Sequence, residues 1–206
     1  MTSSLNTKSI IVTGASSGLG RATSLRLGQE GAKVFCVDIN LDAALETCEL
    51  ITSAGGTAVA YKADMGSEPE IVDMVQQATN EFKTIDGLLA NAGIAGTGAA
   101  HETSLKDWNN LINVSLTGKW LCAKHLLPHM MANKFGSIIF QSSICALNGF
   151  PNLVAYSAAK GAIAAITRQM ATDYGEYNIR INAIAPGTIE TELVRETNRL
   201  RLNKAK

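Results

Sequence analysis

A tyrosine and a lysine stand four residues apart in the stretch YSAAK, where only small residues separate Tyr156 from Lys160. On a helix this spacing places both side chains on the same face. Each group titrates near pH 10 in water, and a neighbouring ammonium lowers the pKa of a phenol by about one to three units. A phenol tuned in this way can accept or donate a proton near neutral pH. The pair therefore predicts acid–base chemistry on a hydroxyl or carbonyl oxygen.

A glycine-rich turn, TGASSGLG, follows the apolar stretch SIIV and precedes a helical stretch. Gly14 permits a tight turn, Gly18 lets backbone N–H groups approach a pyrophosphate, and Gly20 allows close packing of helix on sheet. The spacing G-x-x-x-G-x-G differs from the better-known dinucleotide fingerprint. Taken alone, such a turn is a weak signal for a nucleotide site.

Asp38 strengthens that signal because it ends the next apolar stretch, AKVFCVD. A carboxylate at this position can accept hydrogen bonds from an adenosine ribose and repels a 2′-phosphate. No arginine or lysine lies within the glycine turn or directly after Asp38 to receive such a phosphate. Capping of the following helix, the alternative role for Asp38, is better suited to Asn40 or Asp42. The sequence therefore favours NAD over NADP.

The elements that must position these residues alternate between strands and helices. Strands are expected at 9–14, 32–38, 57–64, 85–91, 136–143 and 179–187. Helices are expected at about 18–29, 41–55, 67–82, 104–132 and 153–174, with a kink at Pro128. This order predicts an α/β fold, a Rossmann-like doubly wound parallel sheet with helices on both faces. Ligands of such sheets bind at the carboxyl ends of the strands.

The composition predicts a single domain over residues 1–206, with 46% hydrophobic residues, 17% charged residues and a formal net charge of zero. Neither nucleic acid nor an anionic membrane is favoured as a partner by that charge. No apolar run reaches the roughly 18 residues of a membrane span, so we expect a cytoplasmic protein. The four cysteines match no zinc pattern, and no third ligand accompanies His125 and His129, so no metal is expected.

From about residue 8 to residue 192 the sequence resembles the classical short-chain dehydrogenase/reductase family. Six motifs carry the resemblance: TGASSGLG, NAG at 91–93, Asn113, the serine pair 142–143, YSAAK and PGTIET. Ala90 departs from the family, which usually has asparagine there. The resemblance implies an NAD-dependent oxidoreductase acting on a secondary alcohol or ketone. An NADP-dependent 3-oxoacyl thioester reductase and a non-catalytic NAD-binding regulatory protein are the alternatives.

The resemblance also implies the residues of the site. Tyr156 is expected to be the acid–base and Lys160 its partner, with Ser143 on the substrate oxygen and Asn113 organising a water that relays protons. The cofactor is expected to contact Gly14, Ser16, Ser17, Gly18, Leu19, Asp38, Ile39, Asp64, Met65, Asn91, Ala92, Gly93, Tyr156, Lys160, Pro186, Gly187, Ile189 and Thr191. A small, neutral alicyclic or aliphatic alcohol is expected against Ser143, Cys145, Tyr156 and Gly187. The mostly apolar pocket is expected to add residues after Gly187 and Ile94, Ala95, Ile144, Asn148 and Phe150.

Assembly and the end of the chain complete the expectations. The helices at about 104–132 and 153–175 carry more apolar surface than one sheet face can cover, including Leu111, Trp120, Leu121, Ala164 and Met170. Members of the family pair these helices across a two-fold axis, so a homodimer or homotetramer is expected. The family usually continues past PGTIET to another helix and a seventh strand. Here a helix is expected to begin, and the last strand and helix are expected to be absent.

Overall fold

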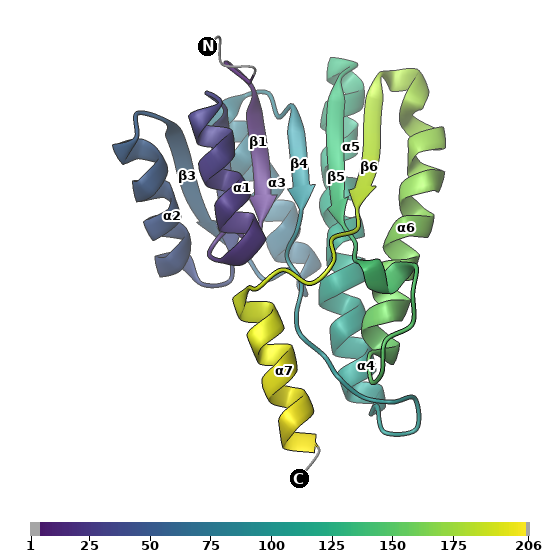
Figure 1. Ribbon diagram of the computed structural model, residues 1–206. Coiled ribbons are helices and arrows are strands. Elements are labelled where there is room, and N and C mark those ends of the chain that lie inside the picture. The colour runs from purple at the N-terminus through teal and green to yellow at the C-terminus, as the bar shows by residue number, and fades with distance from the viewer. Residues whose placement is uncertain (1–4, 205–206) are drawn as a thin grey trace.

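A six-stranded parallel sheet forms the centre of the computed structural model, which describes residues 5–204 and side chains as far as residue 200 (Figure 1). The strands are β1 (Ser9–Thr13), β2 (Lys33–Asp38), β3 (Thr57–Lys62), β4 (Gly87–Ala90), β5 (Gly136–Gln141) and β6 (Ile179–Ile184). Their order across the sheet is β3-β2-β1-β4-β5-β6. The direction of winding reverses between β1 and β4, and ligands of open parallel sheets bind at such a point.

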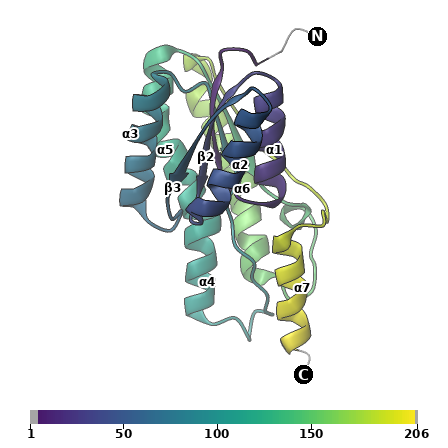
Figure 2. The same ribbon diagram turned by 90° about the vertical axis from the view of Figure 1, so that its left-hand side faces the viewer.

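Helices cover both faces of the sheet, as the sequence predicted. They are α1 (Gly18–Gln29), α2 (Leu41–Ser53), α3 (Glu68–Phe82), α4 (Leu105–Ile112), α5 (Gly118–Asn133), α6 (Val154–Tyr174) and α7 (Glu192–Lys204). Figure 2 shows α1 and α2 on one side of the sheet and α3 and α5 on the other. The chain thus has the predicted Rossmann-like, doubly wound architecture.

Neighbouring residues of the strands alternate between two buried clusters. Ile11 and Leu88 belong to the cluster beneath α3, α5 and α6, whereas Val12 and Leu89 belong to the cluster beneath α1 and α2. This alternation follows from the two-residue period of a strand. Because both faces are buried, the central strands consist of nearly continuous apolar residues, which made them recognisable in the sequence.

The long helix expected at 104–132 is divided by a π-helical turn at Asn113–Thr117, which separates α4 from α5. The expected site of distortion was Pro128, yet α5 continues through Pro128 to Asn133. Directly after the π-turn, Gly118 lies against the segment that follows β3. A Cβ atom at Gly118 would stand 2.1 Å from the carbonyl oxygen of Met65, so this approach requires glycine.

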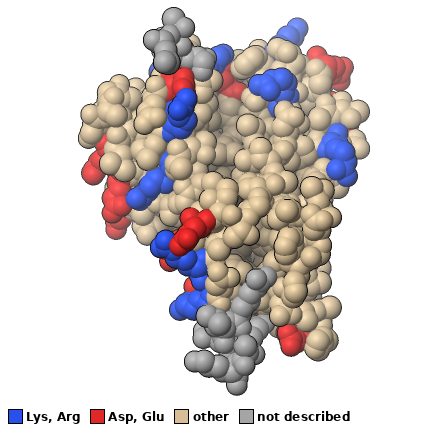
Figure 3. Space-filling view, viewed as in Figure 1, with Lys and Arg blue, Asp and Glu red and all other residues tan. Residues whose placement is uncertain are grey.

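Residues of both charges lie on the face of the molecule shown in Figure 3. On the face in Figure 3, lysine, arginine, aspartate and glutamate lie mainly around the margins, and most of the central surface is uncharged. Between residues 5 and 204, no helix has both the length and the hydrophobicity that crossing a bilayer requires.

Candidate active site

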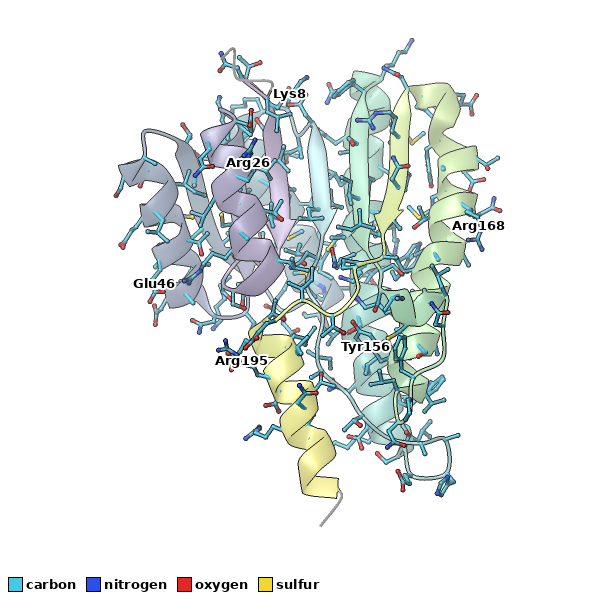
Figure 4. All side chains as sticks on the ribbon, viewed as in Figure 1. Lys8, Arg26, Glu46, Tyr156, Arg168 and Arg195 are labelled. Atoms are coloured by element: carbon cyan, nitrogen blue, oxygen red, sulfur yellow. The ribbon has the colours of Figure 1, made fainter. Side chains whose placement is uncertain are left out.

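A cavity of about 490 Å³ opens where the strands end. Its walls come from the turn after β1, the ends of β2 to β5, the first turns of α6 and the segment 186–194. Every residue that the sequence predicted for the cofactor lies in these walls, and so does Ser143. Figure 4 shows Tyr156 on α6 near the segment that leads from β6 into α7. The cavity thus unites the two ends of the predicted site.

The glycine turn provides a cradle for an anion. Gly14 and Gly18 have φ angles of +69° and +51°, which side chains other than glycine adopt at a cost. A Cβ atom at Gly20 would stand 1.9 Å from the carbonyl oxygen of Gly14, so α1 packs too closely for any larger residue. The Ser17 side chain makes no capping bond, and no acidic residue lies in the first turn of α1. The amides at this helix end are therefore suited to a pyrophosphate.

The carboxylate of Asp38 is held at the edge of the cavity by two backbone amides. One oxygen accepts from Ser16 N at 3.1 Å and the other from Asn40 N at 3.0 Å. Asn40 itself caps α2, because its Oδ1 accepts from Ala43 N at 3.2 Å. Each carboxylate oxygen keeps a lone pair that can accept from a ribose hydroxyl. The geometry fits a nucleotide ribose, and capping of α2 is left to Asn40.

Thr13 and Asn91 fasten the two turns that flank the switch point. The Thr13 Oγ1 accepts from the backbone N–H groups of Asn91 and Ala92, both at 3.1 Å. In return, the Asn91 Nδ2 donates to Thr13 O at 3.0 Å. The turn after β1 and the turn after β4 therefore form one hydrogen-bonded unit in the wall of the cavity.

Tyr156, Lys160 and the serine pair form the polar end of the cavity. The Lys160 Nζ lies 5.3 Å from the centroid of the Tyr156 ring and donates to Gln141 O at 2.9 Å. Ser142 donates to Lys160 O at 2.9 Å, which ties β5 to α6. The Ser143 Oγ accepts from the amide of Cys145 at 3.2 Å, and Ser143 lies close enough to Tyr156 to act against the rise of the Tyr156 pKa. Of the two serines, Ser143 is thus the one placed beside the phenol.

Burial dominates the titration of both key groups. It raises the pKa of Tyr156, and the hydrogen bond with Ser143 lowers that pKa in part. Burial also lowers the pKa of Lys160 to about 8, because this residue is only 3% exposed. We expected Lys160 to bring the pKa of Tyr156 down toward neutrality. The pKa of Tyr156 is instead above its ordinary value, and burial is the main cause.

Asn113, expected to organise a proton-relaying water, lies on the π-turn. Its side chain is exposed, donates to Gly66 O at 2.9 Å and does not line the cavity. Two residues later, the fully buried Ser115 accepts from Ile94 N at 3.2 Å at the cavity wall. No motif marked Ser115, which is one of several polar residues on this helical stretch.

The substrate end also differs in part from the expectation. Among the residues proposed there, the cavity is lined by Ile94, Ser143, Tyr156 and Gly187. The remaining ones lie outside its walls, namely Ala95, Ile144, Cys145, Asn148 and Phe150. Leu193 and Val194 of α7 line the cavity and belong to the residues after Gly187 that were expected there. Sequence reasoning missed Asn110 and Val114, which also line the cavity and which no motif marked.

The two histidines of α5 have separate partners. The His129 Nε2 accepts from Ile85 N at 3.1 Å, which fastens the segment before β4. The His125 Nε2 lies 2.8 Å from Glu68 Oε1 at the start of α3. Among residues 5–204, no three His, Cys, Asp or Glu side chains are grouped so that they could hold a metal ion. Both histidines therefore connect α5 to neighbouring elements.

Comparison with known proteins gives a consistent result. The family model described as short chain dehydrogenase matches residues 8–201. The chain is 42% identical over 192 residues to glucose 1-dehydrogenase 2 of Bacillus subtilis, covering 91% of this chain and 74% of that one. It is 40% identical over 185 residues to cis-4-hydroxycyclohexanecarboxylate dehydrogenase of Sinomonas cyclohexanicum, covering 89% and 74%. A solved structure of NAD+-bound xylitol dehydrogenase superposes with a TM-score of 0.87 at 34% identity, covering 89% and 71%.

Proposed function

The chain belongs to the short-chain dehydrogenase family of oxidoreductases, and from this premise we propose that it transfers a hydride between NAD(H) and a secondary alcohol or ketone. One observation carries the proposal: Tyr156, Ser143 and Lys160 line the same cavity as the glycine turn and Asp38. A phenol that can transfer a proton therefore shares one compartment with a cradle for a dinucleotide. Bound NAD(H) supplies the hydride chemistry, and the chain supplies orientation and the proton.

Tyr156 is the proposed acid–base. As a neutral phenol it can donate directly to a ketone oxygen, whereas alcohol oxidation requires it to lose its proton first. The Lys160 ammonium, 5.3 Å from the ring centroid, favours the phenolate. A nearby positive charge stabilises the charged form of a phenol. Lys160 therefore acts against burial, which raises the pKa of Tyr156.

Ser143 is the proposed partner of the substrate oxygen. Because its Oγ already accepts from Cys145 N, its hydroxyl proton remains available for donation. A fixed donor of this kind stabilises the charge that develops on an alkoxide oxygen. Ser143 and Tyr156 would then hold one substrate oxygen between them.

NAD is the proposed coenzyme because of Asp38. A 2′-phosphate beside this carboxylate would place like charges together, and the two amides that hold Asp38 restrict its movement away. The similar xylitol dehydrogenase structure is NAD+-bound, which supports the same choice here. For the same reason Asp38 disfavours the alternative of an NADP-dependent 3-oxoacyl thioester reductase.

The proposed substrate class is a small, neutral alicyclic or aliphatic alcohol. Beyond Tyr156, the cavity is lined by the apolar side chains of Ile94, Val114, Leu193 and Val194. Apolar walls with few convergent polar groups suit a substrate that carries one hydroxyl on a hydrocarbon frame. The similarity to a cis-4-hydroxycyclohexanecarboxylate dehydrogenase supports an alicyclic alcohol within this class.

A screen of alcohols with NAD and with NADP tests the proposal. Purified protein is mixed with a panel of cyclic alcohols, linear secondary alcohols and polyols, and NADH or NADPH formation is followed by absorbance at alkaline pH. We expect turnover of cyclic or linear secondary alcohols with NAD. Tight NADH binding without turnover of any panel member or of the matching ketones would favour the non-catalytic alternative.

We further propose that the chain forms a homodimer or homotetramer through α4, α5 and α6. Leu111, Leu121 and Met170 are buried within the chain itself and leave less spare apolar surface than the sequence suggested. Trp120, however, is 42% exposed on α5, and a partner copy would cover it. Light scattering should show an oligomer that a Trp120→Glu variant weakens. A monomer at micromolar wild-type concentration would refute this proposal.

A further inference from the structure

A buried lysine that the proposed reaction does not use lies behind the cavity wall. Lys119 is the second residue of α5, and only 2% of it is exposed. Its Nζ donates to Ala90 O at 2.9 Å and also to Ala92 O. A hydrophobic side chain of similar length would fill this space without the cost of burying an amine. The hydrogen bonds to the two carbonyls are therefore the feature that distinguishes lysine here.

Both carbonyls belong to the turn that forms the wall of the cofactor cavity. Ala90 ends β4, and Ala92 lines the cavity between Asn91 and Gly93. From the opposite side, the same turn is held by Thr13, whose Oγ1 accepts from Ala92 N. The turn is thus fixed between the end of β1 and the Lys119 amine.

Ser115 adds a third bond from the same helical segment. It precedes Lys119 by four residues across the π-turn, and its Oγ accepts from Ile94 N at 3.2 Å. Together the two side chains hold three backbone groups of the segment 90–94. Burial, and after it the charge of Lys160, keep the pKa of Lys119 well below its usual value. Retaining an amine in such a position is costly, which indicates that its bonds serve the site.

We propose that Lys119 is a positioning residue for dinucleotide binding, because it sets the turn at Ala90–Gly93 in the shape that the cofactor meets. This inference rests on the proposed function, since it assumes that NAD(H) occupies the cavity. Without the amine, the buried carbonyl of Ala90 and the partly buried carbonyl of Ala92 lose this partner, and the turn moves to recover hydrogen bonds elsewhere. Cofactor binding must then restore the original shape, so affinity falls while the groups around Tyr156 remain in place.

The test compares Lys119→Met with Lys124→Met, a change at an exposed lysine of the same helix whose amine contacts Glu68 and the Trp120 ring at the surface, away from the cavity. NADH dissociation constants are measured by fluorescence at equal concentrations of folded protein, and KM and kcat follow with the best alcohol from the screen. For Lys119→Met we expect about tenfold weaker NADH binding and a similar rise in KM for NAD, with kcat within a few-fold. The Lys124→Met protein should match the wild type.

A purely structural role would lower the melting temperature and leave the NADH dissociation constant of the folded protein unchanged, and that result overturns the inference. If Lys119→Met does not fold, Lys119→Gln is measured, whose shorter amide cannot reach both carbonyls and should also weaken binding. Wild-type affinity in the glutamine variant, or failure of both variants to fold, likewise overturns it. Absence of NADH binding by the wild type would instead refute the proposed function.

Discussion

Replacing Asp38 by asparagine should change the choice of coenzyme. The substitution keeps the size of the side chain and removes its charge at the edge of the cavity. Two unit charges 4 Å apart interact by roughly 1 kcal/mol in bulk water and roughly 4 kcal/mol at an effective dielectric constant of 20. Asp38 is half-buried, so its repulsion of a 2′-phosphate lies between these limits. About 1.4 kcal/mol corresponds to a tenfold change in affinity and lies near the low end of this range, so we expect the wild type to prefer NADH over NADPH by about tenfold or more.

Fluorescence titration with NADH and NADPH measures this preference without knowledge of the substrate. In Asp38→Asn the ratio of the two dissociation constants should fall by about tenfold or more. Absolute NADH affinity should also fall a few-fold, because the amide can accept from only one of the two backbone groups, Ser16 N or Asn40 N. The exposed Asp42, in the first turn of α2, provides the control Asp42→Asn. An unchanged ratio in Asp38→Asn would refute the role assigned to this carboxylate.

Three further predictions concern stability. Burial lowers the pKa of Lys160 from 10.5 to about 8 in the folded chain. The unfolded chain therefore binds this proton more tightly, and below pH 8 the difference lowers the free energy of unfolding by roughly 3 kcal/mol. Urea unfolding should therefore show Lys160→Met to be more stable than the wild type at pH 7, and the difference should shrink as the pH rises from 8 to 10. A difference that stays constant with pH would contradict the lowered pKa of Lys160. Gly20→Ala should destabilise the fold and weaken NADH binding, because its Cβ would stand 1.9 Å from Gly14 O, and a variant that melts like the wild type would disprove the close approach. Gly161→Ala should stabilise α6 by about 0.5–1 kcal/mol in the same assay, because a Cβ atom at this position meets nothing within 4 Å. A loss of stability in this variant would contradict the open space around Gly161.

Much of the fold could be read from the sequence because each element carries a local signal. The apolar strands lead to recognisable motifs: the glycine turn follows β1, and Asp38 is the last residue of β2. These two sites lie at neighbouring strand ends, so parallel pairing of β1 and β2 brings them together. The residues expected to contact the cofactor line one cavity for the same reason, and the family resemblance supplied most of them.

The π-turn explains why part of this helical stretch could not be placed from the sequence. An α-helix advances about 100° per residue, and an inserted π-turn shifts the phase of every residue around it. Spacing alone therefore could not decide which residues of the turn face inward, and the structure buries Ser115 and exposes Asn113. The burial of Lys119 was equally hidden, because in the sequence it does not differ from the exposed Lys124.

The most direct test of the account is the Tyr156→Phe variant. It removes the proposed proton carrier and leaves the rest of the cavity in place. NADH formation is measured with the best alcohol of the panel, and NADH binding is measured by fluorescence on the same preparation. The account predicts that turnover nearly disappears while the NADH dissociation constant stays within a few-fold of the wild type. A phenylalanine variant that keeps more than about a tenth of the wild-type rate would contradict the assignment of Tyr156 as acid–base.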